Sequence, residues 1–127
     1  MIYTSYFGKM KSFPKNFEPI CIARWKPKWY HGKVLLTLAP PDHLLRWWRA
    51  SGKTVRDQIQ FMKVYRGEVL QWLNPRAVEK MIKQIAGDKT PVLVCFEAEG
   101  FCHRHIIAQW LRANGIRCEE WNETRKG

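Results

Sequence analysis

Residues 91–114 have the sequence PVLVCFEAEGFCHRHIIAQWLRAN, which predicts a strand, a short loop and a helix in succession. The apolar run 91–96 has the composition of a buried strand, and residues 102–114 carry apolar side chains at helical spacing. In an open α/β sheet, ligands bind beyond the carboxyl ends of the strands, and a helix N-terminus there offers free N–H groups to an anion. This stretch therefore predicts a parallel-sheet fold and the position of a ligand site.

Strands and helices also alternate in the rest of the chain. Strands are predicted over 2–7, 19–23 and 116–121, with a short strand or extended loop over 34–38, and helices over 40–51, 54–73 and 75–86. The intervening segments 8–14 and 25–33 are predicted as loops, the first of them basic. This alternation indicates a single α/β domain over residues 1–127, with a mainly parallel sheet of four or five strands, helices on both faces and a frayed tail at 122–127.

Two of the helices have clear end signals. Thr54 and Asp57 have the spacing of a capping box, with aspartate in the place of the usual glutamate. Asn74 is a favourable N-cap before Pro75, and Gly87 follows the last apolar residue of that helix. These signals fix the predicted starts of the helices at 54 and 75.

Composition limits the class of protein. A chain of 127 residues with 46% hydrophobic residues suits one globular core, and no apolar stretch approaches the roughly 18 residues of a membrane span. The N-terminus lacks the basic and apolar regions of a signal peptide, so a cytoplasmic location is expected. Reduced thiols are accordingly expected for the four cysteines, rather than disulfides.

Positive charge is concentrated outside the strand–loop–helix unit. The formal net charge is +11, and residues 1–50 hold nine Lys/Arg against two acidic residues, whereas residues 91–127 hold five of each. Such an excess favours polyanionic partners, with affinity that falls as salt rises. A nucleotide or nucleic acid is the predicted partner and a membrane is not; the alternative is a soluble protein whose lysines are merely solvated.

Two residues of the motif are candidates for catalysis. Glu97 lies where strand 91–96 leaves the core, on the side of Leu93 and Cys95, and a carboxylate there is able to act as a base or nucleophile or to accept a hydrogen bond from a ligand hydroxyl. Cys102 lies at the helix start, where the dipole favours a thiolate, as would His103 and Arg104 if their side chains turn inward. The alternatives are a solvated or paired carboxylate and a buried structural cysteine.

Three further residues are candidates for holding an anion. Arg104 has a guanidinium suited to phosphate, or it pairs with Glu97 or Glu99 and locks the loop. His103 stands beside it. Arg24 ends strand 19–23 and should reach the same carboxyl edge, where Trp25, Trp29 and Tyr30 either offer a stacking surface for bases or cover the end of the sheet.

No metal site or cofactor is predicted. Zinc held by Cys95, Cys102 and a histidine is the less favoured alternative, because six residues separate the cysteines and no second pair follows. The chain also lacks a Gly-rich phosphate loop, GxSxG, HExxH and a dinucleotide fingerprint. These absences argue against the enzyme classes that such motifs mark, and they indicate no other class.

At this motif the chain resembles the domain-of-unknown-function family 488, in its short branch. The hallmark of that family is an apolar strand ending Cys-x-Glu and, after a short gap, Cys-His-Arg at a helix start, which here are Cys95, Glu97 and residues 102–104. The resemblance covers about residues 2–121. It implies an α/β fold and a shared site, and no particular reaction.

The leading hypothesis is a domain that binds a phosphate-bearing ligand, a nucleotide or a nucleic-acid end, at the carboxyl edge of the sheet. If it is an enzyme, hydrolysis or transfer at a glycosidic or phosphoester bond is the expected class. The alternatives are a thiol- or metal-dependent enzyme using Cys102, and a non-catalytic nucleic-acid-binding module. The sequence does not indicate an oligomeric state.

Overall fold

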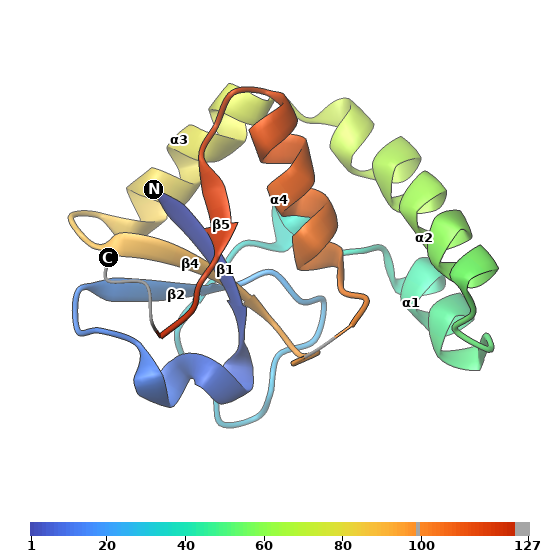
Figure 1. The fold of residues 1–127 in the computed structure, drawn as a ribbon, viewed down its shortest axis with the longest axis horizontal. Helices are drawn as coiled ribbons and strands as arrows, with labels where there is room; N and C mark the ends of the chain where they lie inside the picture. Colours follow the sequence, from blue (N-terminus) through green and yellow to red (C-terminus); the bar gives the residue numbers. More distant parts are fainter. Residues whose placement is uncertain (99, 124–127) are drawn as a thin grey trace.

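The fold is built on one five-stranded sheet in which every strand is parallel to its neighbours (Figure 1). It is seen in a computed structural model that describes residues 1–98 and 100–123. The strands are β1 (Ile2–Tyr6), β2 (Phe17–Cys21), β3 (Lys33–Val34), β4 (Thr90–Cys95) and β5 (Cys118–Glu120), in the order β3-β2-β4-β1-β5. The predicted α/β class and parallel sheet are therefore confirmed.

The strand register places three strand ends at one edge of the sheet. The central strand β4 pairs with β1 through Tyr6 and Cys95, and with β2 through Cys21 and Val94. After β2 the chain keeps contact with β4, since Ile22 N–H donates to the Val94 carbonyl at 3.1 Å. The segments that follow β2 and β4 therefore leave the sheet side by side, as parallel pairing requires.

Four α-helices follow the strands as the sequence pattern predicts. They are α1 (Asp42–Ala50), α2 (Val55–Glu68), α3 (Pro75–Ala86) and α4 (His103–Ala113). The Thr54–Asp57 capping box forms at the start of α2, with both reciprocal hydrogen bonds at 3.1 Å. Asn74 Oδ1 accepts hydrogen bonds from the N–H groups of Arg76 and Ala77 at the start of α3. Both predicted helix starts are confirmed.

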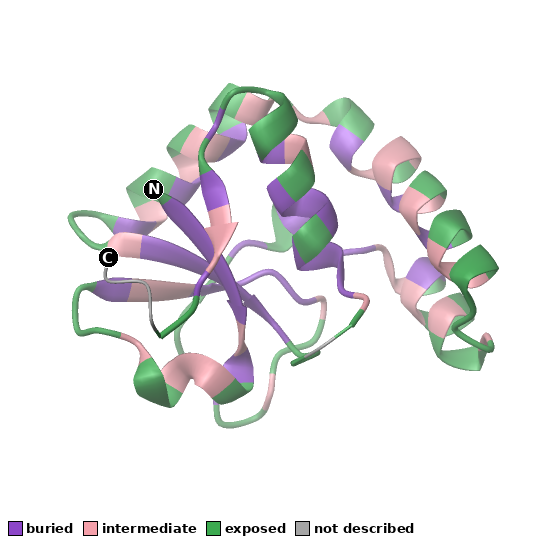
Figure 2. Cartoon of the chain, in the orientation of Figure 1, coloured by how far each residue is buried: buried purple, intermediate pink, exposed green. Residues whose placement is uncertain are grey.

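The two faces of the sheet are covered unequally. Along β4, Leu93 and Cys95 point into a large core that includes buried residues of all four α-helices, whereas Val92 and Val94 point into a smaller, largely aromatic core. The 3-10 helix η1 (Phe7–Ser12) and loop residues cover this second face. Figure 2 shows the strands buried between these layers and the outer faces of the helices exposed. No described helix is long and apolar enough to cross a membrane.

Some element boundaries differ from the predictions. The predicted helix 54–73 ends at Glu68, and a 3-10 turn, η3 (Leu70–Trp72), follows it. Trp72 Nε1 donates to the Gly67 carbonyl at 3.1 Å, which satisfies an acceptor at the broken helix end. The loop predicted at 8–14 largely forms η1, and residues 36–38 form the 3-10 helix η2. Of the predicted frayed tail, residues 124–127 lie outside the described residues.

Candidate functional site

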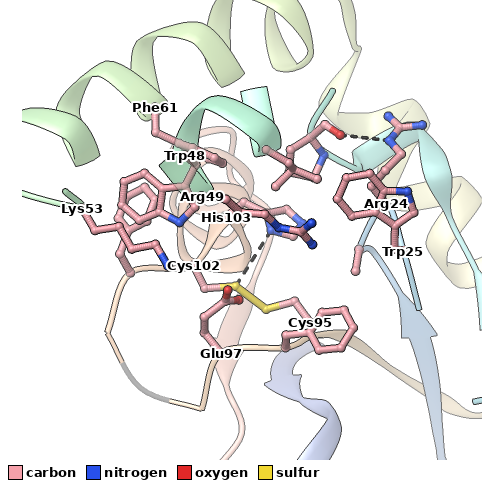
Figure 3. A pocket seen from close by; sticks show the side chains of 15 residues that line it. Arg24, Trp25, Trp48, Arg49, Lys53, Phe61, Cys95, Glu97, Cys102 and His103 are labelled. Carbon is pink, nitrogen blue, oxygen red and sulfur yellow. Dashed lines mark hydrogen bonds between the residues drawn. A yellow bond between two sulfur atoms is a disulfide. The ribbon is translucent and has the colours of Figure 1, made fainter. Parts of the chain in front are cut away.

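A cavity of about 230 Å³ opens at the carboxyl edge of the sheet, between the loops after β2 and β4, the end of α1, α2 and the start of α4 (Figure 3). We call its buried polar and sulfur-bearing residues the floor: Cys95, Cys102 and His103. Its charged and more exposed residues form the rim: Arg24, Arg49, Lys53 and Glu97. Its aromatic wall consists of Trp25, Trp48, Phe61 and Phe101.

The two cysteines of the floor are joined. Cys95 ends β4 and Cys102 is the N-cap residue of α4, and their sulfur atoms form a disulfide. The expectation of reduced thiols is therefore wrong for this pair, because the loop between strand and helix brings the two sulfurs together. Cys21 and Cys118 are free and buried. In this state Cys102 has no thiol to act as the predicted nucleophile.

His103 lies in the floor as a neutral imidazole. Its Nε2 donates to the Ile22 carbonyl at 2.8 Å, since a carbonyl only accepts. Burial, with the nearby Arg104 charge, lowers the pKa of His103 to about 4. The remaining nitrogen, Nδ1, therefore carries a lone pair, and it lies 3.9 Å from Cys102 Sγ.

Arg104 does not line the cavity. Its side chain is 1% exposed and forms a salt bridge with Glu120 of β5, with Nη2 3.0 Å from Oε2. Nε also donates to that carboxylate, while Nη1 donates to the Glu97 carbonyl and lies 3.1 Å from Cys95 Sγ. The guanidinium thus locks the loop to the last strand, with Glu120 as its carboxylate partner rather than Glu97. Anion binding by Arg104 stays a prediction that this arrangement does not support, and Glu99 lies outside the described residues.

Arg24 reaches the cavity from the loop after β2. Its Nε donates to the Pro40 carbonyl at 3.0 Å and its Nη2 to the Ala39 carbonyl at 3.4 Å. These bonds hold the half-buried guanidinium beside the cavity, although the strand ends at Cys21, three residues before Arg24. Glu97 is exposed and lines the same cavity as Cys95, as their shared side of the strand predicted.

The last turn of α1 and the turn that follows it supply two cations, Arg49 and Lys53, that sequence reasoning did not select. The guanidinium of Arg49 lies 4.5 Å from the Trp25 ring centre, and Lys53 Nζ lies 6.0 Å from that of Trp48. Trp48 packs on Phe101 at 4.9 Å between ring centres, and this contact brings the end of α1 over the loop after β4. No local signal marks Arg49 or Lys53, because their position depends on that packing.

The aromatic residues after Arg24 have separate roles. Trp25 is 39% exposed and lines the cavity. Tyr30 is buried in the second core, where its hydroxyl donates to the Lys33 carbonyl at 2.6 Å and burial raises its pKa. Trp29 packs edge-on against Phe7 in the same region. Of the three predicted stacking residues, the structure places only Trp25 at the cavity.

A comparison with known families agrees with the motif. Residues 10–115 match the model described as the active DUF488-N3 subclade. The chain belongs to the DUF488 family. No curated protein and no solved structure gives a significant match. Family membership fixes no ligand or reaction.

Proposed function

We propose that the cavity binds a phosphate-bearing ligand with an aromatic base, a nucleotide or the end of a nucleic acid. The observation that carries the proposal is the meeting of three cations with an aromatic wall around one small cavity. The rim has an excess of positive charge, because its one carboxylate, Glu97, is outnumbered by the cations of Arg24, Arg49 and Lys53. A phosphate complements that excess, and an aromatic base complements the wall.

Each part of such a ligand has a counterpart in the cavity. The fork-shaped guanidinium groups of Arg24 and Arg49 suit phosphate oxygens, and Lys53 adds a point charge. Trp25 presents an exposed ring for stacking. Glu97 is positioned to accept a hydrogen bond from a sugar hydroxyl or to act as an acid or base. Hydrolysis or transfer at a glycosidic or phosphoester bond is the reaction class that this set would serve.

Cavity size favours a single nucleotide unit. The volume of about 230 Å³ is below the roughly 300–1,000 Å³ of most small-molecule pockets. A mononucleotide or a terminal nucleotide would insert its base or its phosphate, and the rest would lie over the exposed rim. The basic excess of residues 1–50 would then attract a longer nucleic acid toward this edge.

A comparison of nucleotide binding between wild type and Arg49→Ala is the sharpest test of the proposal. Calorimetric titration of wild type with nucleoside monophosphates, inorganic phosphate and short oligonucleotides should give saturable binding of at least one nucleotide. Arg49 is exposed, so its removal should spare the fold, yet losing a charge-assisted contact should weaken nucleotide binding by about tenfold or more.

Arg46→Ala is the matched control. Arg46 lies on the same helix and is exposed, but it pairs with Asp42 and does not line the cavity. It should bind nucleotides as wild type does. Equal weakening in both variants, or oligonucleotide binding that neither variant changes, would reject the cavity and favour a non-catalytic basic surface.

A further inference from the structure

We infer that the floor, once its disulfide is reduced, is a binding site for one thiophilic divalent cation such as Zn²⁺. The ligands would be Cys95 Sγ, Cys102 Sγ and His103 Nδ1. These donor atoms lie within 4.8 Å of one another, and all three residues are buried. Among the described residues, no other group of His, Cys, Asp or Glu has this arrangement.

The donor set matches the chemistry of zinc. Thiolate and imidazole are the ligands that zinc prefers, and two thiolates neutralise the charge of the ion. The six-residue gap between the cysteines counted against zinc in the sequence. The structure removes that objection, because the strand end and the helix N-cap return both sulfurs to one point.

The contacts around the floor suit a metal ligand set. The Nε2–H of His103 donates to the Ile22 carbonyl at 2.8 Å, so Nδ1 is left unprotonated and faces Cys102. A bond from the other ring nitrogen to a backbone carbonyl, as here, is what orients most metal-bound histidines. On the other side, Arg104 Nη1 lies 3.1 Å from Cys95 Sγ and would stabilise its thiolate.

The fourth coordination position would face the cavity. All three floor residues line it, and no fourth His, Cys, Asp or Glu among the described residues joins the group. Zinc sites with three protein ligands keep a position for water or substrate, whereas closed structural sites use four. The inferred site is therefore of the open kind, and it stands whether or not the ligand of the rim is a nucleotide.

The metal-bound form would arise from the disulfide in two steps, reduction and then metal binding. A dithiol reductant breaks the Cys95–Cys102 bond with two electrons and two protons, and it becomes a cyclic disulfide. Binding of the cation then displaces the two thiol protons to solvent. The disulfide and the metal-bound form exclude each other, because a sulfur in the disulfide is not a thiolate.

Metal titration of the whole protein tests the inference. After reduction with a dithiol and removal of the reductant under argon, wild type should bind one equivalent of Zn²⁺ in competition with a chromophoric chelator. Co²⁺ in place of Zn²⁺ should give a thiolate-to-cobalt charge-transfer band and the intense visible bands of tetrahedral cobalt. This spectroscopic readout needs no variant, so a failure of variants to fold cannot obscure it.

Matched variants and the oxidised protein complete the test. Cys102→Ala and His103→Gln should each weaken Zn²⁺ binding by about 100-fold or more, since even the loss of a residue that only hydrogen-bonds to a metal ligand costs about 10–100-fold. Cys21→Ala and His105→Gln should bind as wild type does, and oxidised wild type should not bind. Binding of less than about a tenth of an equivalent by the reduced protein, a cobalt spectrum without thiolate bands, or equal losses in Cys21→Ala and Cys102→Ala would overturn the site.

Discussion

Two arginines show how the floor and the rim of the cavity differ. Arg104, beside the floor, is 1% exposed, and its guanidinium is held by a carboxylate, backbone carbonyls and a cysteine sulfur. Arg49, on the rim, is exposed and rests on the ring of Trp25. The same side chain thus holds the structure in place at one site and remains available to a ligand at the other.

The difference separates what the floor and the rim contribute to function. Buried polar groups are stabilising only while every partner is present, so the geometry of the floor is fixed before a ligand arrives. Removing an exposed cation costs the fold little stability, but exposed cations govern the attraction of anions and the dependence of that attraction on salt. While the disulfide is intact, changes at the floor should therefore act mainly on stability, and changes at the rim mainly on the binding of anions.

Arg104→Ala should have the largest effect on stability. The change removes the salt bridge and the bond to the Glu97 carbonyl, and it leaves the Glu120 carboxylate without a cation, although the Thr4 hydroxyl still donates to it at 2.6 Å. Breaking a buried ion pair of this kind costs about 3–5 kcal/mol, and the part-exposed Glu120 places the expected loss near about 3 kcal/mol. Urea denaturation followed by tryptophan fluorescence measures the change in the free energy of unfolding.

Arg117→Ala controls for the loss of a positive charge. Arg117 is exposed just before β5, so its removal should change the free energy of unfolding by less than about 0.5 kcal/mol. Arg104→Lys keeps a charge but not the fork, and it should recover only part of the loss. A stable Arg104→Ala protein with weakened phosphate binding would reverse the assignment and restore the anion-binding prediction.

His103 should make stability depend on pH. Burial lowers its pKa to about 4 in the folded protein, against an ordinary value of 6.5 in the unfolded chain. Between these pH values the unfolded chain binds a proton that the folded chain does not. The free energy of unfolding should therefore fall as the pH drops through this window, by up to about 3 kcal/mol, and this contribution is fully present above pH 6.5.

Urea denaturation from pH 4 to pH 8, with a chelator present and the disulfide intact, measures this dependence. His103→Gln should flatten the profile between pH 4 and 6.5. His105 is the matched control: it is exposed, and although partial burial lowers its pKa, His105→Gln should change the profile less than His103→Gln does. A profile unchanged by His103→Gln would show that this imidazole is not held neutral by burial.

The floor was predictable because its residues are close in sequence. A strand that ends at Cys95 and a helix that starts after Cys102 must bring both residues to one sheet edge, and Glu97 follows by the period of two. The salt bridge that holds Arg104 was not predictable. Its carboxylate partner, Glu120, comes from a strand that pairs on the far side of β1, and no local pattern distinguishes it from other acidic residues.

The rim was predictable only through Arg24 and Glu97. Arg49 in the last turn of α1 and Lys53 in the turn after it look like an ordinary solvated surface in the sequence. Their placement depends on Trp48, which packs against Phe61 of the next helix and against Phe101, a residue far away in the chain. Helix starts were easier, because a capping box or an Asn-Pro pair is a local interaction that acts within one turn.

Thr54→Ala should have the smallest of the three effects and should act on one side of the cavity. Thr54 Oγ1 accepts the Asp57 N–H at 3.1 Å, and the residue directly follows Lys53 of the rim. Loss of such a cap costs about 1 kcal/mol, because an N–H group at the helix start loses its partner. Hydrogen exchange followed by mass spectrometry should show faster exchange in the first turn of α2 and unchanged exchange in β4 and α4.

Thr37→Ala, at another exposed threonine, is the control and should leave the exchange of α2, β4 and α4 unchanged. Faster exchange in α4 as well would mean that floor and rim unfold as one unit, and the contrast between them would then lie in chemistry alone.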